Sequence, residues 1–185
     1  MSARKFLKIT PSPFGPFAII WTNQNKPEIL RVILSDPETA ASEKVLRLFP
    51  GTHEAACRYV DRIAGQLQSI LKGFPESFNL DAISLERCSQ FQQKVLTAEH
   101  QIPRGYISTY GRIASNLKTP GAARAVGHAL ATNPFPVIIP CHRAVRSDLR
   151  IGGFQGGAAM KRRLLEMEGH EIDGRGRILK PKLYY

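Results

Sequence analysis

The sequence lacks any long uninterrupted hydrophobic run. No apolar segment approaches the roughly 20 residues that a membrane-spanning helix needs. The first ten residues, MSARKFLKIT, contain neither a long apolar stretch nor a small-residue cleavage site. We therefore expect no membrane association. The expected location is the cytoplasm, on the nucleoid if the source is prokaryotic, or the nucleus if it is eukaryotic.

Cysteine is scarce, and no two cysteines form a C-x-x-C pair. Cys57, Cys88 and Cys141 are odd in number and widely spaced, which argues against a disulfide framework and favours reduced thiols. Metal ligands are scarce too. In HEAAC, His53 and Cys57 stand four residues apart and could share a helix face, but no second ligand pair lies nearby. We expect no metal site.

Acidic residues are outnumbered, 15 against 26 basic ones, which gives a net charge of +11. The excess lies in residues 83–185, which carry 16 basic and 7 acidic residues, against 10 and 8 in residues 1–82. So basic a segment favours a polyanionic partner, and nucleic acid is the first candidate. A domain that merely lies far from its isoelectric point is the alternative.

The first eighty residues predict a small α/β domain, residues 1–80. Short runs rich in Ile, Val and Phe, separated by Pro, Gly and Asn, predict strands at 5–10, 16–21 and 28–34. Amphipathic patterns predict helices within 37–49 and 52–73. Residues 73–81 are the candidate linker.

Residues 81–185 predict a second, mostly helical domain. Helices are expected within 89–102, 108–117, 119–132 and 152–170. Ser108 or Thr109 is the expected N-cap of the second helix. The third is expected to open with Thr119 as cap and Pro120 in its first position. Two short helices joined by a turn match the helix-turn-helix outline, although many αα-hairpins bind nothing.

The end of the chain carries two further signals. Gly169 is the expected C-cap of the last helix. The basic tail DGRGRILKPKLYY is expected to be an exposed segment, with a phosphate contact as the less favoured alternative.

The stretch VIIPCHRAV, residues 137–145, places a thiol, an imidazole and a guanidinium side by side. We expect its apolar start to form a buried strand. A free thiol has a pKa near 8.5, so Cys141 needs a nearby base or positive charge to act as a nucleophile. Adjacent side chains diverge on an extended chain, so His142 would need a turn or a bridging water to reach the sulfur. An inert core thiol is the alternative.

Several ordered motifs in residues 85–172 give a more specific indication. They are FQQKVL, ISTYGRIA, AARAVGHALATNP, IIPCHRAV and FQGGAAMKRRLLEMEGH. Together they resemble the O6-alkylguanine-DNA alkyltransferases, also called methylated-DNA–protein-cysteine methyltransferases. The first eighty residues are similar to the family's variable domain only loosely, mainly in PFGPFAIIW. The resemblance implies an RNase H-like α/β N-terminal domain and a mostly α C-terminal domain with a helix-turn-helix.

The resemblance implies direct-reversal DNA repair. The protein would transfer the alkyl group of O6-alkylguanine, and of O4-alkylthymine, from double-stranded DNA to its own cysteine. An S-alkylcysteine is a thioether without a carbonyl that water can attack, so each molecule would act once. The resemblance further implies a monomer that needs no cofactor. The zinc ligands of some family members have no match in this chain.

The resemblance implies a catalytic role for each residue of this sequence that matches a catalytic residue of the family. Cys141 would be the alkyl acceptor, with His142, through a water, and Glu168 as the relay that removes the thiol proton. Asn133 would brace the turn before the active-site segment. Tyr110 would rotate the 3′ phosphate and assist proton delivery to the leaving guanine.

The implied substrate- and DNA-binding residues are Arg124, Tyr110, Ala144, Gln155, Leu130, Thr109 and Ala123. Arg124 would fill the stack that the rotated base vacates. The carbonyls of Cys141 and Ala144 would accept from the guanine amino group, and the backbone N–H of Gln155 would meet O6. Leu130 would line the pocket.

Two residues depart from the family pattern. Phe154 stands where a tyrosine is common, and Leu149 where glycine is frequent. Leucine resists the positive φ of a tight primed turn, so we expect a different shape for the loop 146–153. The alternatives to an alkyltransferase are a non-catalytic DNA-binding module that senses alkyl lesions and a cysteine hydrolase.

Overall fold

The computed structural model of the protein describes residues 4–185 and contains two compact units. One unit consists of residues 4–85 together with 134–138, and the other of residues 86–133 together with 139–185. No helix within residues 4–185 is long and apolar enough to cross a membrane.

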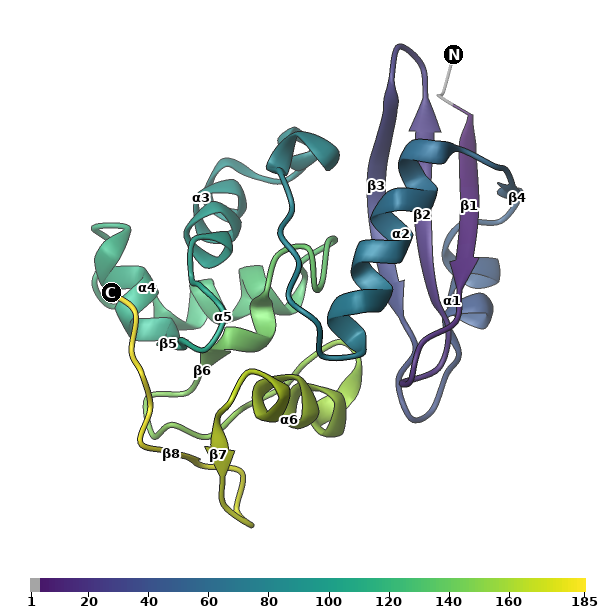
Figure 1. Ribbon diagram of the computed structural model, residues 1–185. Coiled ribbons are helices and arrows are strands. Elements are labelled where there is room, and N and C mark those ends of the chain that lie inside the picture. The colour runs from purple at the N-terminus through teal and green to yellow at the C-terminus, as the bar shows by residue number, and fades with distance from the viewer. Residues whose placement is uncertain (1–3) are drawn as a thin grey trace. The chain divides into compact units, whose positions relative to one another are not determined.

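The first unit is built on a four-stranded sheet (Figure 1). Its strands are β1 (Lys5–Thr10), β2 (Phe17–Asn23), β3 (Pro27–Leu34) and β4 (His53–Glu54). The order is β3-β2-β1-β4, with β1, β2 and β3 antiparallel and β4 parallel to β1. The three predicted strands are therefore confirmed. Every residue of β2 from Phe17 to Thr22 is buried, as expected for a central strand that is covered on both faces.

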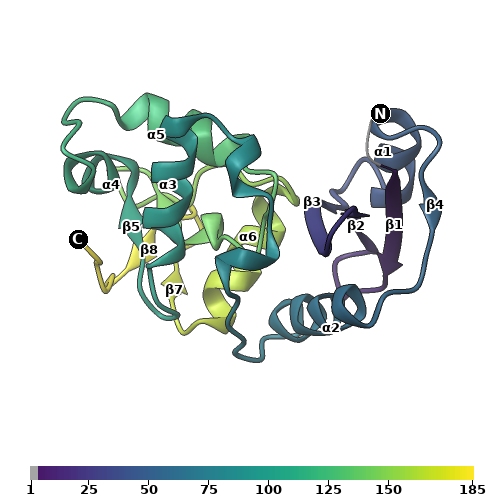
Figure 2. The same cartoon turned by 90° about the horizontal axis from the view of Figure 1, so that it is seen from above.

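Two helices cover the opposite faces of this sheet, as Figures 1 and 2 show. They are α1 (Ala41–Leu48) and α2 (Arg58–Leu71), and the short 3-10 helices η1 (Leu80–Ala82) and η2 (Leu85–Arg87) follow. Val45 of α1 packs against Ala18 and Ile20 of β2. The helix expected from residue 52 begins only at Arg58, because His53 pairs with β1 as part of β4. His53 and Cys57 therefore do not share a helix face.

The second unit is mostly helical. Its helices are α3 (Gln90–His100), α4 (Tyr110–Asn116), α5 (Ala123–Ala131) and α6 (Gly157–Met167). The Thr109 hydroxyl caps α4 by accepting from the backbone N–H of Arg112 at 3.2 Å, as predicted. The prediction for α5 is wrong at its start. Thr119 donates instead to the Ala114 carbonyl at 3.1 Å, and α5 opens three residues after Pro120 without a side-chain cap.

The apolar segment before Cys141 is a buried turn, and the predicted strand is wrong. Val137 has a φ of 73°, which no regular strand accommodates, and Pro136 and Pro140 flank the turn. A short 3-10 helix, η3 (Cys141–Arg143), follows directly. The strand β6 (Ala144–Val145) then pairs in parallel with β5 (Ser108–Thr109). This pairing ties the reactive segment to the residues that precede α4.

The basic tail, residues 173–185, is anchored at one buried residue, Ile178, but seven of its thirteen residues are exposed, as expected. The strands β7 (Glu171–Ile172) and β8 (Ile178–Leu179) form a hairpin, and Ile178 lies in a core cluster with Leu165 and Ile107. The backbone N–H of Ile107 donates to Lys182 at 2.9 Å, and that of Tyr184 donates back to Ile107 at 2.8 Å. These paired bonds hold the end of the chain against the loop between α3 and α4.

Candidate active site

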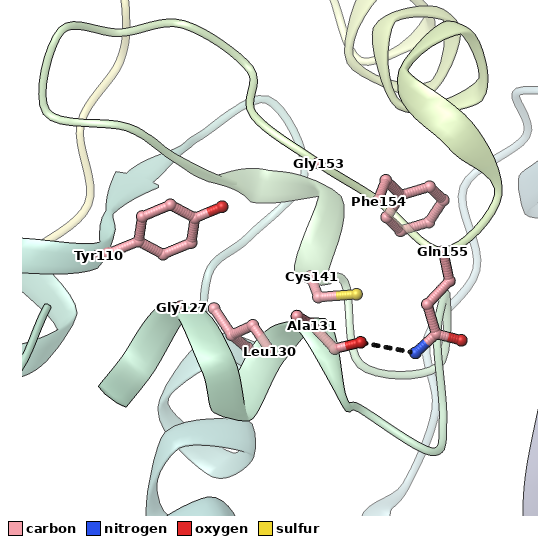
Figure 3. Close-up of a pocket in the computed structure, with 8 residues that line it drawn as sticks. All are labelled: Tyr110, Gly127, Leu130, Ala131, Cys141, Gly153, Phe154 and Gln155. Carbon is pink, nitrogen blue, oxygen red and sulfur yellow. Dashed lines mark hydrogen bonds between the residues drawn. The ribbon is translucent and has the colours of Figure 1, made fainter. Parts of the chain in front are cut away.

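Cys141 lies in a small pocket of the second unit, with a cavity volume of about 250 Å³. The residues that line the pocket are Tyr110, Gly127, Leu130, Ala131, Cys141, Gly153, Phe154 and Gln155. Figure 3 shows the thiol between Tyr110 on one side and Phe154 and Gln155 on the other. The Cys141 residue is only 6% exposed, so the pocket is its route to a reaction partner.

The sulfur of Cys141 accepts a hydrogen bond from a buried amide. Nδ2 of Asn133 lies 3.3 Å from Sγ and 3.4 Å from the Ile139 carbonyl oxygen. Burial raises the pKa of Cys141 to about 11, and the Asn133 amide opposes this rise. The resting side chain is therefore a thiol, and a reaction through sulfur needs a base to take its proton.

His142 is placed to be part of that base. Its Nε2 lies 2.9 Å from Oε1 of Glu168, and its Nδ1 is buried without a hydrogen-bond partner among residues 4–185. Burial lowers the pKa of His142, against the opposing charge of Glu168, so the ring is neutral near pH 7. A neutral ring that donates from Nε2 has its lone pair on Nδ1. This nitrogen can accept a proton.

Glu168 is held ionised by two partners. Its Oε2 accepts from Nε of Arg143 at 2.9 Å and its Oε1 from Nη2 of Arg143 at 2.8 Å, a bidentate pair. Burial alone would raise the pKa of Glu168, but His142 and Arg143 hold it well below its usual range. Arg143 also donates to the Ile102 carbonyl at 2.6 Å. Arg143 is thus the ion-pair partner of Glu168, and the carboxylate fixes the tautomer of His142.

Tyr110 stands at the first position of α4, with its ring in the pocket. Burial raises its pKa, and the nearby charges of Glu99 and Cys141 add to the rise, so the phenol keeps its proton. Gly152, with a φ of 69°, lies so close that a Cβ there would stand 3.3 Å from the Tyr110 hydroxyl. Leu149 adopts a φ of 64° despite its side chain, and its N–H donates to the Arg146 carbonyl at 2.9 Å. The turn therefore forms without glycine.

The other predicted residues occupy four kinds of position. Leu130 lines the pocket, as predicted, and Gln155 lines it as well. Arg124 is exposed at the second position of α5. Thr109 and Ala123 line a second hollow, which is formed mainly by α4 and the start of α5. Ala144 is fully buried and does not line the pocket.

Two buried charged residues beside the site were not predicted from the sequence. Lys161 of α6 is 0% exposed and donates from Nζ to the Ala144 carbonyl at 2.7 Å. Glu99 of α3 is also 0% exposed. Their burial could have been predicted from helical spacing. Lys161 stands three residues before the apolar Leu164, and Glu99 stands four residues after the apolar Val95. Within residues 4–185, no three His, Cys, Asp or Glu side chains gather as metal ligands would.

Comparison with known proteins gives matches to one family. The sequence model for the DNA-binding domain of 6-O-methylguanine DNA methyltransferase matches residues 90–170. A methylated-DNA–protein-cysteine methyltransferase of Methanothermobacter thermautotrophicus is 39% identical over 115 residues, which are 62% of this chain and 64% of that protein. One of Mycobacterium leprae is 45% identical over 92 residues, 49% of this chain and 56% of that protein. The chain thus matches between half and two thirds of these relatives' length.

Solved structures extend the similarity over more of the chain. A variant of the Mycobacterium tuberculosis O6-methylguanine methyltransferase superposes with a TM-score of 0.71 and 30% identity, covering 89% of this chain and 92% of that one. The M. tuberculosis protein solved in complex with DNA superposes with a TM-score of 0.70 and 29% identity, covering 88% and 92%. With the thiol, the His142–Glu168 pair and these similarities together, the chain belongs to the methylated-DNA–protein-cysteine methyltransferase family.

Proposed function

We propose that this protein repairs DNA by transferring the alkyl group of O6-alkylguanine, and of O4-alkylthymine, to Cys141 in a single-turnover reaction. The observation that carries the proposal is a thiol in a small pocket beside the α4–α5 helix pair, backed by the buried His142–Glu168 pair. A reactive sulfur that only an inserted group can reach suits a base rotated out of a duplex.

The chemistry balances without a cofactor. The thiol proton of Cys141 leaves for Nδ1 of His142 through a water, and Glu168 stabilises the resulting imidazolium. The sulfur then attacks the alkyl carbon, so that an S–C bond forms as the C–O6 bond breaks. The leaving guanine takes a proton from Tyr110, and the proton held by His142 passes through water to the Tyr110 phenolate, so that both side chains return to their starting states. The products are an S-alkylcysteine and normal guanine.

The two members of the relay require different charge states: His142 must be neutral and Glu168 must be ionised. The surroundings of each side chain favour the required state. Burial keeps His142 neutral and able to accept a proton, while Arg143 keeps Glu168 ionised and able to stabilise the charged ring. The Asn133 amide donates to Sγ and so stabilises the developing thiolate. An S-alkylcysteine cannot be hydrolysed at this site, so the reaction ends after one transfer.

Recognition of double-stranded DNA is assigned to α4 and α5, the two helices of the helix-turn-helix outline. The exposed Arg124, at the start of α5, would fill the stack left by the rotated base. The guanine would then lie against Leu130 and meet the backbone N–H of Gln155. Thr109 and Ala123, at the starts of the two helices, would contact the DNA backbone.

The carbonyl that is expected to accept from the guanine amino group already accepts a hydrogen bond within the protein. The Ala144 carbonyl is the expected acceptor for the guanine amino group, but it already accepts from Nζ of Lys161 at 2.7 Å. Its second lone pair could still accept from the base. The Cys141 carbonyl is the simpler acceptor in this proposal.

We extend the proposal to the organisation of the whole chain. Residues 1–80 would form an RNase H-like α/β domain and residues 81–185 the DNA-binding alkyltransferase domain. The antiparallel strands β1, β2 and β3, with helices on both faces of their sheet, support the first assignment. The protein would act as a monomer in the compartment that holds the DNA.

The test is repair of a duplex that contains one O6-methylguanine. The wild-type protein should remove the lesion, and Cys141→Ala should leave it in place while still binding the duplex. If Cys141→Ala repaired the DNA at the wild-type rate, the protein would act without its thiol, and the proposal would be wrong. Methanol released over many turnovers would indicate a hydrolase instead.

A further inference from the structure

We propose that Gln155 is a positioning residue through its side chain, which fixes the pocket loop, residues 153–156, to the end of α5. The two hydrogen bonds of this side chain would hold the backbone N–H of the same residue where O6 of the bound guanine lies. The inference rests on the proposed function, which assigns that N–H to O6, and it adds a separate role for the side chain.

The side-chain amide of Gln155 reaches two carbonyl groups at the end of α5. Its Nε2 donates to the Asn133 carbonyl at 2.5 Å and to the Ala131 carbonyl at 3.4 Å, and Figure 3 shows the second bond. Ala131 is the last residue of α5, and Asn133 follows the C-cap residue Thr132. The last carbonyls of a helix have no partner within the helix. The Gln155 amide therefore bonds to groups that α5 leaves open.

A second glutamine makes the same kind of contact from a different element. Nε2 of Gln92, on α3, donates to the Ala129 carbonyl at 3.0 Å and to the Thr132 hydroxyl at 3.1 Å. Gln92 and Gln155 are both half-buried. The two residues bond to the same helix end, but Gln92 joins it to α3, whereas Gln155 joins it to the pocket loop. Comparing them separates support of the helix from placement of the loop.

The end of α5 is held in place by bonds that do not involve Gln155. The N–H of Asn133 donates to the Leu130 carbonyl at 3.2 Å. Its Nδ2 lies 3.4 Å from the Ile139 carbonyl oxygen and 3.3 Å from Sγ of Cys141. Asn133 is also 0% exposed. We therefore expect loss of the Gln155 amide to displace the pocket loop and to leave the sulfur where it is.

The pocket loop lies between two sharp turns of the backbone. Gly152 and Gly157, directly before and after it, have φ values of 69° and 88°, which glycine adopts most readily. The start of the loop is held by Nζ of Lys161, which donates to the Gly153 carbonyl at 3.2 Å. Within residues 4–185, the backbone N–H of Gln155 donates to no other group. This N–H is therefore available to a ligand, and the side chain of Gln155 sets its place.

The experiment measures methyl transfer from a duplex that contains O6-methylguanine, in a single turnover and over a range of DNA concentrations. Gln155→Met keeps the length of the side chain and removes its N–H donor. A misplaced contact group slows the reaction step and leaves remote binding intact. We expect the rate constant at saturating DNA to fall about tenfold, while the Kd for the duplex changes by less than about twofold. Gln155→Lys, whose ammonium group can donate to the same carbonyls, should stay within about threefold of the wild-type rate constant.

Gln92→Met is the matched control, because it removes the same amide from the same helix end. We expect both methionine variants to unfold at lower urea concentration than the wild type, since each loses hydrogen bonds. Only Gln155→Met should transfer the methyl group more slowly. Equal slowing in both variants would show that the bonds act through α5, and the proposal would be wrong. Folded Gln155→Met that transfers at the wild-type rate would overturn it as well.

Alkylation of Cys141 by iodoacetamide separates this inference from the proposed function. The reagent needs the thiol and no contact at O6, so every variant should react within about twofold of the wild-type rate. Slower alkylation of Gln155→Met would locate the effect at the sulfur and contradict a role in placing the loop. Wild-type protein that is alkylated but transfers no methyl group would refute the proposed function and this inference with it. Equal transfer by the wild type and Gln155→Met would refute this inference alone.

Discussion

At the scale of single residues, the function of Cys141, His142 and Arg143 depends on their separation. A 3-10 helix has three residues per turn, so three consecutive side chains point in three directions. The Cys141 thiol lines the pocket, while His142 and Arg143 both reach Glu168, at 2.9 Å and 2.8 Å. A trio that is adjacent in the sequence thus becomes a nucleophile, Cys141, a proton acceptor, His142, and an ion-pair partner for Glu168, Arg143.

Asn133→Ala tests the amide beside the thiol. It removes the Nδ2 donor at 3.3 Å from Sγ, so the thiolate loses its hydrogen bond and the pKa of Cys141 should rise further. We expect alkylation by iodoacetamide to slow about tenfold and the free energy of unfolding to fall by about 1–3 kcal/mol. Asn25→Ala, in an exposed turn, is the matched control. An unchanged alkylation rate in a folded variant would show that the amide does not act on the sulfur.

Glu168→Gln tests the buried carboxylate through the pH dependence of stability. The pKa of Glu168 is depressed in the folded protein, so its contribution is present above its usual value of 4.5 and is lost as the pH falls through the folded-state pKa. We expect the variant to lose about 3 kcal/mol or more at pH 7, because Arg143 keeps a partly buried, unpaired charge. Urea titrations from pH 3 to pH 7 measure this difference, with the exposed Glu171→Gln as control.

The sequence was informative at this scale for Cys141 and His142 through residue type, and for Glu168 and Tyr110 through the family resemblance. The structure joins His142, Arg143 and Glu168 in one hydrogen-bonded cluster directly after Cys141. Glu99 and Lys161 were missed because charged residues are rarely buried. Only their helical spacing from apolar neighbours pointed to the core. The bond from Asn133 to the sulfur was not predicted, although the resemblance implied that Asn133 braces the turn before Cys141.

At the scale of elements, the C-terminus of α6 holds Glu168 in place. Gly169, with a φ of 91°, ends the helix, and the N–H of His170 donates to the Leu165 carbonyl at 3.0 Å while that of Gly169 donates to Glu166 at 3.0 Å. These two bonds form a Schellman motif. Glu168 is the C-cap residue, so the turn that stops the helix also sets the position of the carboxylate.

Gly169→Ala tests this turn. A Cβ is disfavoured at positive φ by roughly 1 kcal/mol, although nothing lies within 4 Å of the added atom. We expect the free energy of unfolding to fall by about that amount and alkyl transfer to slow as Glu168 shifts. The control is Gly174→Ala, which stands in open space and is not at positive φ. Equal stabilities of the two variants, from urea unfolding, would contradict the role assigned to the turn.

Helices and strands were predicted correctly where apolar residues repeat at a regular spacing. The predictions were wrong where a turn determines the local structure. Periodic apolar residues predict β1, β2 and β3 and the four helices of the second unit. The predicted start of α5 was wrong because Thr119 bonds back to Ala114, which a local capping rule does not consider. The prediction for the segment before Cys141 was wrong because its apolar residues, including Val137 at a φ of 73°, are buried in a turn. Apolar composition reports burial, and it does not distinguish a strand from a buried turn.

At the scale of the whole molecule, the net charge of +11 is the dominant electrostatic feature. Phosphate contacts by Lys and Arg release counterions, so affinity for DNA should fall steeply as salt rises. We expect the logarithm of the association constant to fall linearly with the logarithm of salt concentration, and Arg124→Ala to reduce the slope by about one. Fluorescence anisotropy with a labelled duplex measures both. Affinity that does not change across a several-fold range of salt would contradict the DNA-binding role.

The most direct test of the central claim is the stoichiometry and position of the transferred methyl group. The protein is titrated with a duplex that contains O6-methylguanine, and its intact mass and Cys141 peptide are followed. The account predicts one added CH₂ unit per protein molecule, located on Cys141, with repair ending at one equivalent of lesion. A methyl group on any other residue, or continued repair beyond one equivalent with an unmodified Cys141, would contradict it.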